Sequence, residues 1–439
     1  MVPEQKKKLL FGLLLILSFS LFCISESIQQ PAQWSEQIKV VSGITNSLAI
    51  SDRSIAVDSL GNVHIVCFDL VVGVFYVHND SGSFESIEIG PSGIFSVIAT
   101  DTSNNIHIAY CGSDGSPEND YEIFYTNNIG GSFSTSIKVT SNDVRDFSPS
   151  IGIDSSGHAY IAYEHTMGSQ TKIFCVNNSG GSFGIPIQIS NNSYTNETFP
   201  SITVDGSGNI HIVYYGNISM NEVDILYTNS NAVYFPNSTL IESPDEENSK
   251  ASIAVDLNGV AHVVFQGRNL SAPTTFEIFY VSNSKGSFET PILIDNGEVY
   301  SPSVAVGPVD DVHIVYPKLD GGDFEIYHTS NATGSFGTPT KITEDDRHEI
   351  YPSLTVDAFG YVHVIYMRLH GPLWGEICYV TTSPFPPQGI LEGEGTFPIH
   401  FVVIGVSVAA VVGVIAFIVV RRIRGEDSVV GGKIRKEKK

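Results

Sequence analysis

One line of sequence decides the fold: Ser54-Ile-Ala-Val-Asp58-Ser-Leu-Gly61-Asn-Val-His64-Ile-Val. It returns six more times, with its Asp58 position falling at Asp101, Asp154, Asp205, Asp256, Gly307 and Asp357. The steps between these positions are 43, 53, 51, 51, 51 and 50 residues. Repeats of about 40–50 residues that hold several short strands are typical of β-propellers.

Each repeat has room for four short strands, which we call A to D from the axis outward. Strands A and B flank the Asp turn, and strand C is an apolar stretch such as Glu277-Ile-Phe-Tyr280. A Gly-Ser-Phe triplet then leads to strand D. The triplet ends at Phe84, Phe133, Phe183, Phe288 and Phe336, and repeat four has Phe235 in its place. The sequence therefore predicts an all-β fold, a seven-bladed propeller of four-stranded blades.

The seventh repeat lacks a strand D, because Pro384, Pro386 and Pro387 follow its strand C. Before the first repeat, Trp34-Ser-Glu-Gln-Ile-Lys-Val40 has the spacing of Phe336 to Ile342. We expect this N-terminal strand to complete blade seven and to close the ring, since closure removes two free sheet edges. The propeller then covers residues 34–383.

The two ends of the chain read as membrane segments. Residues 1–25 pair three lysines with an apolar run, which is typical of a secretory signal peptide; an uncleaved anchor is the alternative. Lipidation at Cys23 is disfavoured, because Phe22 precedes it where a small residue is needed. Residues 384–398 read as a stalk, 399–420 as a transmembrane helix and 421–439 as a basic cytoplasmic tail. The prediction is a single-pass cell-membrane protein with its N-terminal ectodomain outside.

Charge and sequons agree with an exported protein. Residues 26–397 hold 12 basic and 43 acidic residues, a balance of 12 − 43 = −31, which disfavours nucleic-acid partners. Eight Asn-x-Ser/Thr sequons occur in this segment and are candidate glycosylation sites. They are Asn79, Asn177, Asn191, Asn196, Asn217, Asn237, Asn269 and Asn331.

The repeated polar residues are interpreted as scaffold. An aspartate in a tight A–B turn accepts backbone N–H bonds, and glycine three residues on supplies a positive φ. This role is predicted for Asp58, Asp101, Asp154, Asp205, Asp256 and Asp357. The histidines of strand B stand one blade apart and cannot converge on one ion, so we predict no metal, no cofactor and a hydrogen bond between blades. They are His64, His107, His211, His262, His313 and His363.

The Asp turn resembles the Asp-box turns of the sialidase-like, BNR-repeat β-propellers, and the resemblance runs through all seven repeats. It implies a propeller scaffold. The usual box reads Ser-x-Asp-x-Gly-x-x-Trp, whereas here glycine comes three residues after aspartate and no Trp follows. The Phe/Tyr-Arg-Ile-Pro signature of the family's enzymes is absent, and those enzymes have six blades, which argues against sialidase chemistry.

Candidate ligand contacts lie in the D–A and B–C loops, which vary in length and composition. All five arginines between the two membrane segments fall there, and arginine suits bidentate recognition of carboxylates. The ligand-binding hypothesis places an acidic ligand on blades seven and one. Its residues are Arg53, Arg347, Arg368, Trp374, His348 and His370. The alternative is that these arginines pair with nearby acids such as Asp345 and Asp346.

No pair of carboxylates stands out, and the cysteines Cys67, Cys111, Cys175 and Cys378 lie in apolar strands, where free core thiols are expected. No catalytic residue is therefore assigned. The function predicted is a non-enzymatic surface receptor or adhesin for an extracellular glycan or protein. The alternatives are a sialidase-like, glycan-cleaving hydrolase and a structural envelope component.

Overall fold

A computed structural model gives the fold of the part of the chain between the two predicted membrane segments. It describes residues 33–41, 48–51, 53–69, 72–91, 93–113, 120–190, 194, 196–219, 222–230, 235, 238–241, 247–268, 275–371, 374–384 and 386. These residues form only strands, turns and loops, and all belong to one compact unit, Met1–Ile390. They include no helix long and apolar enough to cross a bilayer. The predicted signal peptide, transmembrane helix and tail lie outside them, as does the stalk apart from Pro384 and Pro386.

Each repeat supplies one set of strands in the order that the sequence predicts. Repeats one to three comprise β2 (Leu48–Ala49), β3 (Ile55–Val57), β4 (Val63–Asp69), β5 (Gly73–His78), β6 (Glu85–Pro91), β7 (Gly93–Thr100), β8 (Ile106–Ser113), β9 (Tyr121–Asn127), β10 (Ile137–Lys138), β11 (Asp146–Ile153), β12 (Ala159–Met167), β13 (Gln170–Asn177) and β14 (Ile187–Gln188). Repeats four and five comprise β15 (Asn196–Val204), β16 (Ile210–Ser219), β17 (Glu222–Ser230), β18 (Thr239–Ile241), β19 (Glu247–Val255), β20 (Ala261–Arg268), β21 (Phe276–Ser282) and β22 (Ile292–Gly297). Repeats six and seven comprise β23 (Ser303–Val306), β24 (Val312–Asp320), β25 (Asp323–Ser330), β26 (Thr340–Lys341), β27 (Glu349–Val356), β28 (Val362–Gly371) and β29 (Trp374–Thr381).

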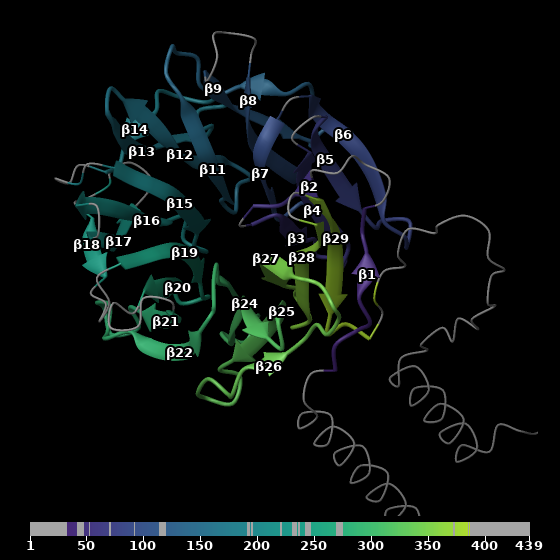
Figure 1. Cartoon of the computed structure of the whole chain (residues 1–439). Helices are drawn as coiled ribbons and strands as arrows, with labels where there is room; N and C mark the ends of the chain where they lie inside the picture. The colour runs from purple at the N-terminus through teal and green to yellow at the C-terminus, as the bar shows by residue number, and fades with distance from the viewer. Residues whose placement is uncertain are drawn as a thin grey trace, which may run out of the picture. The chain divides into compact units, whose positions relative to one another are not determined.

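The strands of a repeat pair antiparallel with their neighbours. Repeats two, six and seven each give a four-stranded sheet and repeat one a five-stranded sheet. Repeats three, four and five are joined into one 12-stranded sheet by single parallel pairs, Thr171 with Asn196 and Val223 with Glu247. Figure 1 shows the repeats following one another in chain order around a ring. The fold is all-β and consistent with a β-propeller.

The N-terminal strand pairs with the last repeat, as the truncated seventh repeat predicts. Strand β1 (Ile38–Lys39) lies antiparallel to β29, with Ile38 opposite Tyr379 and Lys39 opposite Cys378. Its neighbours Val40 and Val41 are fully buried in a core that repeats one and seven share. The first and last strands of the ring are therefore held by one apolar cluster.

Adjacent repeats are joined by aromatic pairs. The phenylalanine of a Gly-Ser-Phe triplet packs edge-on against a strand C tyrosine of the preceding repeat, a favourable geometry for two rings. The pairs are Tyr76–Phe133, Tyr125–Phe183, Tyr227–Phe288, Tyr280–Phe336 and Tyr379–Phe84, with centroids 4.8 to 5.6 Å apart. The repeated triplet therefore supplies an aromatic contact between neighbouring repeats at five junctions.

The Asp turns have the geometry that their sequence predicts. Oδ1 of Asp58 accepts the N–H groups of Leu60 and Asn62 at 2.9 and 2.8 Å, and Gly61 has φ +85°. Equivalent bonds reach Asp101, Asp154, Asp205, Asp256 and Asp357. In repeat six, Asp311 sits so close that a Cβ on Gly307 would come 2.2 Å from its Oδ1. In this repeat the aspartate stands at position 311 and leaves no room for a side chain at position 307, which explains why that residue is glycine.

The strand B histidines bond within a repeat, so the predicted bond between blades is wrong. In five repeats the histidine Nδ1 lies 2.6 to 2.7 Å from a strand C tyrosine hydroxyl. The Nε2 of the same ring lies 3.3 to 3.6 Å from the turn aspartate. The pairs are His64–Tyr76, His107–Tyr125, His211–Tyr227, His262–Tyr280 and His363–Tyr379. Sequence periodicity gave no partner, and the pairing of strand B with strand C brings the tyrosine closer than any neighbouring repeat.

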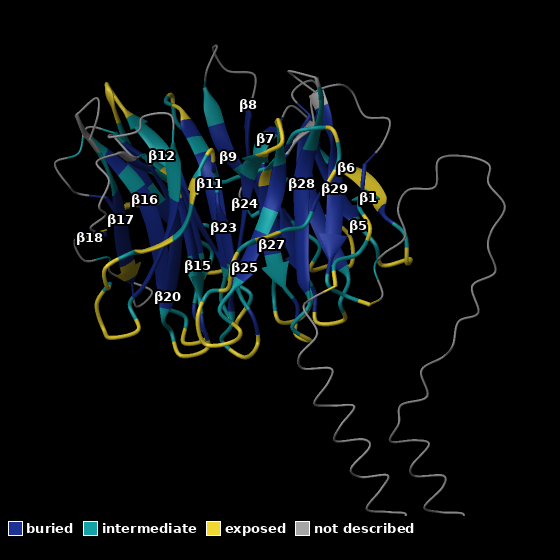
Figure 2. Cartoon of the chain, turned by 60° about the horizontal axis from the view of Figure 1, so that its bottom comes forward, coloured by how far each residue is buried: buried dark blue, intermediate teal, exposed yellow. Residues whose placement is uncertain are grey.

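The unit has two ends, which differ in the loops they carry. The D–A and B–C loops open on one, here called the loop face. The A–B and C–D turns make up the other, the turn face, at the bottom of Figure 2. Buried strands separate the two faces, so a site built on one is independent of the other.

Candidate functional site

Every repeat holds one non-glycine residue with positive φ where strand A begins, at the loop face. These residues are Arg53, Phe95, Ser148, Phe199, Lys250, Ser301 and Tyr351, with φ between 37° and 67°. In repeats two, three, four, five and seven the register between strands A and B shifts beside this residue, as in a β-bulge. Bulges re-aim side chains, and strained backbone of this kind gathers at functional sites. The loop face therefore carries a ring of positions whose side chains vary while the backbone is constant.

Aromatic rings and cations gather on this ring in repeats two to five. The guanidinium carbon of Arg145 lies 3.6 Å from the centre of the Phe147 ring, which also contacts Phe95 at 4.7 Å. Lys250 Nζ lies 4.6 Å above Phe199, and Phe199 stacks on Tyr215 at 5.4 Å. Arg145, Phe199 and Lys250 are exposed. We call Arg145, Phe147, Phe199, Tyr215 and Lys250 the aromatic–cation surface.

One acid, Glu164, lies within this surface. It pairs with Phe147 across β11 and β12, and its Oε1 accepts the Phe199 N–H at 3.0 Å. Burial raises the pKa of Glu164, and the Phe199 N–H and the charges of Arg145 and Lys250 offset only part of that rise. Gln266 plays the same part in repeat five, where its Oε1 accepts the Ser301 N–H at 3.1 Å. Glu164 therefore has a structural role at the bulge and also places a carboxyl group beside two cations.

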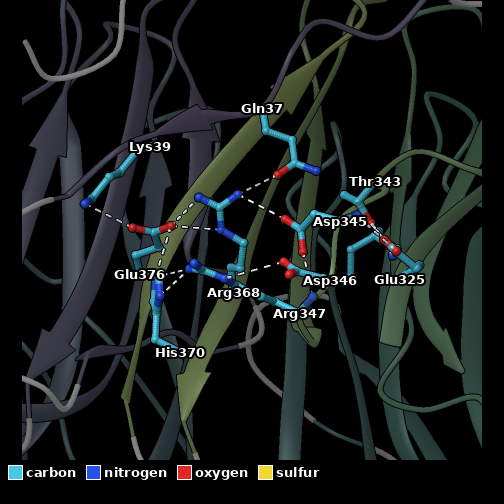
Figure 3. A network of polar contacts seen from close by, with 11 residues as sticks. Gln37, Lys39, Glu325, Thr343, Asp345, Asp346, Arg347, Arg368, His370 and Glu376 are labelled. Atoms are coloured by element: carbon cyan, nitrogen blue, oxygen red, sulfur yellow. Dashed lines mark hydrogen bonds and ion pairs between the residues drawn. The ribbon is translucent and has the colours of Figure 1, made fainter. Parts of the chain in front are cut away.

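Arg368, one of the three arginines predicted to contact the ligand, is held by protein groups (Figure 3). Its Nε donates to Glu376 Oε1 at 2.8 Å, and its Nη1 donates to Gln37 at 2.9 Å and Asp345 at 3.1 Å. Burial alone would raise the pKa of Glu376, but bonds and charges from Arg368 and Lys39 lower it to about 2. This network ties β1 to β28 and β29 and leaves Arg368 little capacity for a ligand.

Three other predicted residues surround that network. Arg347 contacts the His370 ring, with its Nη1 3.0 Å from Nε2, and His370 Nε2 lies 3.1 Å from Glu376. His348 Nδ1 accepts the Phe324 N–H at 3.2 Å. The Arg347 side chain is 40% exposed and that of His348 44% exposed. The structure therefore brings Arg347, Arg368 and His370 together around Glu376.

The remaining predicted contacts do not join them. Arg53 reaches across the ring, where its Nε donates to Ser201 Oγ at 3.2 Å and its Nη2 contacts the Ile253 carbonyl. The backbone of Trp374 begins β29, and its side chain lies outside the described part of the structure. The sequons Asn191, Asn237 and Asn269 fall outside it as well. Asn79, Asn177 and Asn331 lie on the turn face, and Asn196 and Asn217 lie opposite each other at the loop-face end of repeat four.

Metal and thiol chemistry gain no support from the residues that the structure covers. No group of three or more His, Cys, Asp or Glu among them could hold a metal ion. Cys67, Cys111, Cys175 and Cys378 are free and buried, and burial raises the pKa of Cys67, Cys175 and Cys378 to about 12. Such thiols are protonated at neutral pH and are poor nucleophiles.

Sequence reasoning missed the bulge residues for a definite reason. Positive φ is usually found at Gly or Asn, but these positions hold Arg, Phe, Ser, Lys and Tyr. Their fixed place, five or six residues before the turn position, is the only available signal. Aligning the repeats on that position would have grouped Phe199 and Lys250 with the other bulge residues.

No known family model and no curated protein matches the chain. The structure is similar to that of the polysaccharide lyase Uly1, with a TM-score of 0.53 and 12% identity over 80% of this chain and 99% of that one. It is also similar to an ulvan lyase solved bound to -[GlcA(1-4)Rha3S]-, with a TM-score of 0.57 and 10% identity over 79% and 95% of the two chains. A sialidase of Trypanosoma rangeli scores 0.48 at 9% identity, covering 80% of this chain and 59% of that one. Identities this low show likeness of fold alone, and a TM-score below 0.5, as for the sialidase, does not establish a common fold.

Proposed function

We propose that this chain is a seven-bladed β-propeller, closed by its N-terminal strand and anchored by residues 399–420, whose loop face binds an acidic glycan. The observation that carries the proposal is the aromatic–cation surface, in which Arg145 lies over Phe147 and Lys250 over Phe199. Sugar rings stack on exposed aromatic side chains, and Arg and Lys beside them suit carboxylate or sulfate groups. A solved protein of similar fold, bound to -[GlcA(1-4)Rha3S]-, supports a carbohydrate ligand.

We propose binding without cleavage because charged side chains that could take part in catalysis are already bonded to other protein groups. Glu164 already accepts the Phe199 N–H, and Arg368 is saturated by Glu376, Gln37 and Asp345. Most glycosidases need two carboxyl groups placed on either side of the bond to be cleaved. Within the described part of the chain, Glu164 is the one carboxyl group seen to contact the aromatic–cation surface. The alternative remains a glycan-cleaving enzyme, which the experiment below would reveal.

The test is a titration of the full-length protein in detergent micelles with uronate-bearing or sulfated oligosaccharides and with neutral ones of equal length. Arg145→Gln and Phe199→Ala should each weaken acidic-glycan binding about tenfold, which corresponds to about 1.4 kcal/mol. Arg347→Gln is the matched control, because it removes a half-exposed arginine from the same face.

Three results would contradict the proposal. Loss of binding in Arg347→Gln with Arg145→Gln unchanged would place the ligand on repeats seven and one. Equal affinity for neutral oligosaccharides would remove the acidic ligand. Shortened or unsaturated products after prolonged incubation would show cleavage and favour the enzymatic alternative.

A further inference from the structure

The tips of the A–B turns differ between the two halves of the ring. In repeats two, three and four the two tip residues are Thr102-Ser103, Ser155-Ser156 and Gly206-Ser207. In repeats five, six, seven and one a large apolar residue takes this place. Leu257, Val309, Phe359 and Leu60 are 79%, 80%, 69% and 74% exposed. We call these four side chains the apolar half-ring.

These tips are neighbours rather than scattered residues. A hollow on the turn face is lined jointly by Leu257, Pro308 and Ala358 from repeats five, six and seven. Leu257 N donates to Asp310 of repeat six at 3.2 Å, and repeats seven and one share a core. Single exposed apolar residues are normal, but a cluster of large ones marks a surface that something covers.

Both ends of the described chain meet the turn face beside this cluster. Ser35 N donates to Thr381 O at 2.8 Å where β29 ends. Thr382 Oγ1 then accepts the N–H of Val362 at 2.8 Å, three residues after Phe359. The described chain therefore ends next to an apolar tip, and residues 399–420 follow this end in the sequence.

The tether between this exit and the apolar run is short. Residues 383–398 separate Thr382 from Ile399. As a flexible coil, 16 residues have a root-mean-square span of about 22 Å, and fully extended they reach about 55 Å. Tethering at this range raises the effective concentration of the turn face at the bilayer to the millimolar range, so weak contacts suffice.

We propose that the apolar half-ring inserts into the interface of the membrane that anchors the chain, so that the loop face is turned away from the lipid. The proposal rests on the membrane anchor proposed above. A lipid surface is the partner that the short tether, the shared exit and the aliphatic and aromatic tips all favour. The acidic unit is repelled by anionic lipid, so the contact is apolar and should persist at high salt on zwitterionic membranes.

The test uses the full chain in phosphatidylcholine proteoliposomes, in a Cys23→Ser background. The four described cysteines are free and buried, so an introduced exposed cysteine is labelled selectively with a polarity-sensitive fluorophore. Phe359→Cys reports the half-ring. Ser156→Cys, at the same turn position in repeat three, is the matched control.

Nitroxide lipids should quench the label at 359 about threefold more than the label at 156. Adding Leu60→Ser, Leu257→Ser and Val309→Ser should lower the quenching of the label at 359 to the level of the control. Equal quenching at the two positions in floating proteoliposomes overturns the docking and leaves the anchor standing. A label shielded from aqueous iodide but not quenched by lipid shows a protein cover instead, which also overturns it. If the chain does not float with the liposomes, the anchor is wrong and the docking falls with it.

Discussion

Trp34 packs edge-on against His328, with ring centroids 5.1 Å apart and the planes at 71°. Trp34 precedes β1, the fourth strand of repeat seven, and His328 lies on strand C of repeat six. At five other junctions between repeats this position is filled by the phenylalanine of a Gly-Ser-Phe triplet against a tyrosine. The N-terminal segment therefore reproduces the contact between repeats at the point where the chain begins and ends its ring.

Trp34→Ala should lower the free energy of unfolding by about 1–3 kcal/mol, because a part-buried ring and its edge-on contact are lost. Deleting residues 34–41 should lower it by more, since β1 and the buried Val40 and Val41 go with it. Thermal denaturation measures both, and Trp34→Phe, which keeps a ring, is the control. An unchanged melting temperature in the deletion would contradict closure by this strand.

His328 should make the protein sensitive to acid. Burial, and then the charge of His313, lowers the pKa of His328 to about 3, against about 6.5 in the unfolded chain. The unfolded state therefore binds more protons below pH 6.5, and stability falls as the pH drops from 6.5 toward 3. At pH 5 the resulting loss in the free energy of unfolding is about 2 kcal/mol.

His328→Tyr should remove that loss, because tyrosine carries no charge in this range and matches the histidine–tyrosine pairs of the other repeats. Melting temperatures at pH 7 and pH 5 give the measurement, with His158→Asn, in the exposed turn of repeat three, as control. If the variant and the parent lose the same stability between these two pH values, His328 is not the group responsible.

Period and spacing were enough to predict the strand sets, the Asp turns and the pairing of β1 with β29. Each of these depends on residue types that recur, such as Asp58 with Gly61 and the Gly-Ser-Phe triplet. The histidine partner was mispredicted because it depends on which tyrosine the register of strands B and C brings alongside. A register shift of one residue turns a side chain to the other face, so such pairs follow only from the folded sheet.

The candidate site was harder to predict, because its residues recur in position and not in type. Phe199 and Lys250 occupy equivalent bulges yet share no chemistry, and a bulge leaves no mark in the apolar pattern. The sequence also indicates where the arginines lie but not which groups they bond to. Arg368 and Arg53 both sit near the loop face, but their guanidinium groups bond to Glu376 and to Ser201.

Arg368→Ala should destabilise the protein and leave acidic-glycan binding unchanged. It removes the main partner that lowers the pKa of Glu376 to about 2, so the carboxylate is left largely buried with only Lys39 and the His370 ring beside it. Breaking such a half-buried pair costs about 2–4 kcal/mol near neutral pH. In the parent, the contribution of the lowered pKa is present above the unfolded value near 4.5 and is lost as the pH falls toward 2.

Denaturant unfolding and glycan titration, run on the same preparation, separate the two roles of Arg368. Arg368→Lys is the control, because it keeps the positive charge but loses the planar guanidinium group that donates to several partners at once. Weakened glycan binding at unchanged stability would return Arg368 to the ligand site.

Glu349→Gln should stabilise the protein. Glu349 is fully buried beside Asp345 and Glu325, and burial followed by their charges raises its pKa to about 10. The folded state thus holds a proton that the unfolded state releases above about pH 4.5, so stability declines as the pH rises from there toward 10. Glutamine keeps the shape of the side chain and does not need to take up a proton on folding. The free energy of unfolding should therefore increase by up to about 3 kcal/mol at pH 7.

The measurement is the melting temperature of Glu349→Gln and its parent at pH 5 and pH 8. The difference between the two proteins should widen at the higher pH. Glu325→Gln is the control, since Glu325 accepts bonds from Thr343 Oγ1 and Asp345 N and its loss should destabilise. A Glu349→Gln protein less stable than the parent at pH 8 would mean that Glu349 is charged and paired.

Glycans on repeat four should restrict access to the aromatic–cation surface. The sequons at Asn196 and Asn217 lie opposite each other on β15 and β16, and Asn196 is three residues from Phe199. Where mass spectrometry shows these asparagines occupied, Asn196→Gln with Asn217→Gln should strengthen acidic-glycan binding severalfold, because a bulky chain beside Phe199 is removed. Asn177→Gln, on the turn face, is the matched control and should change nothing. Unchanged affinity after both occupied sites are removed would place the ligand away from repeat four, and with it away from Phe199 and Lys250.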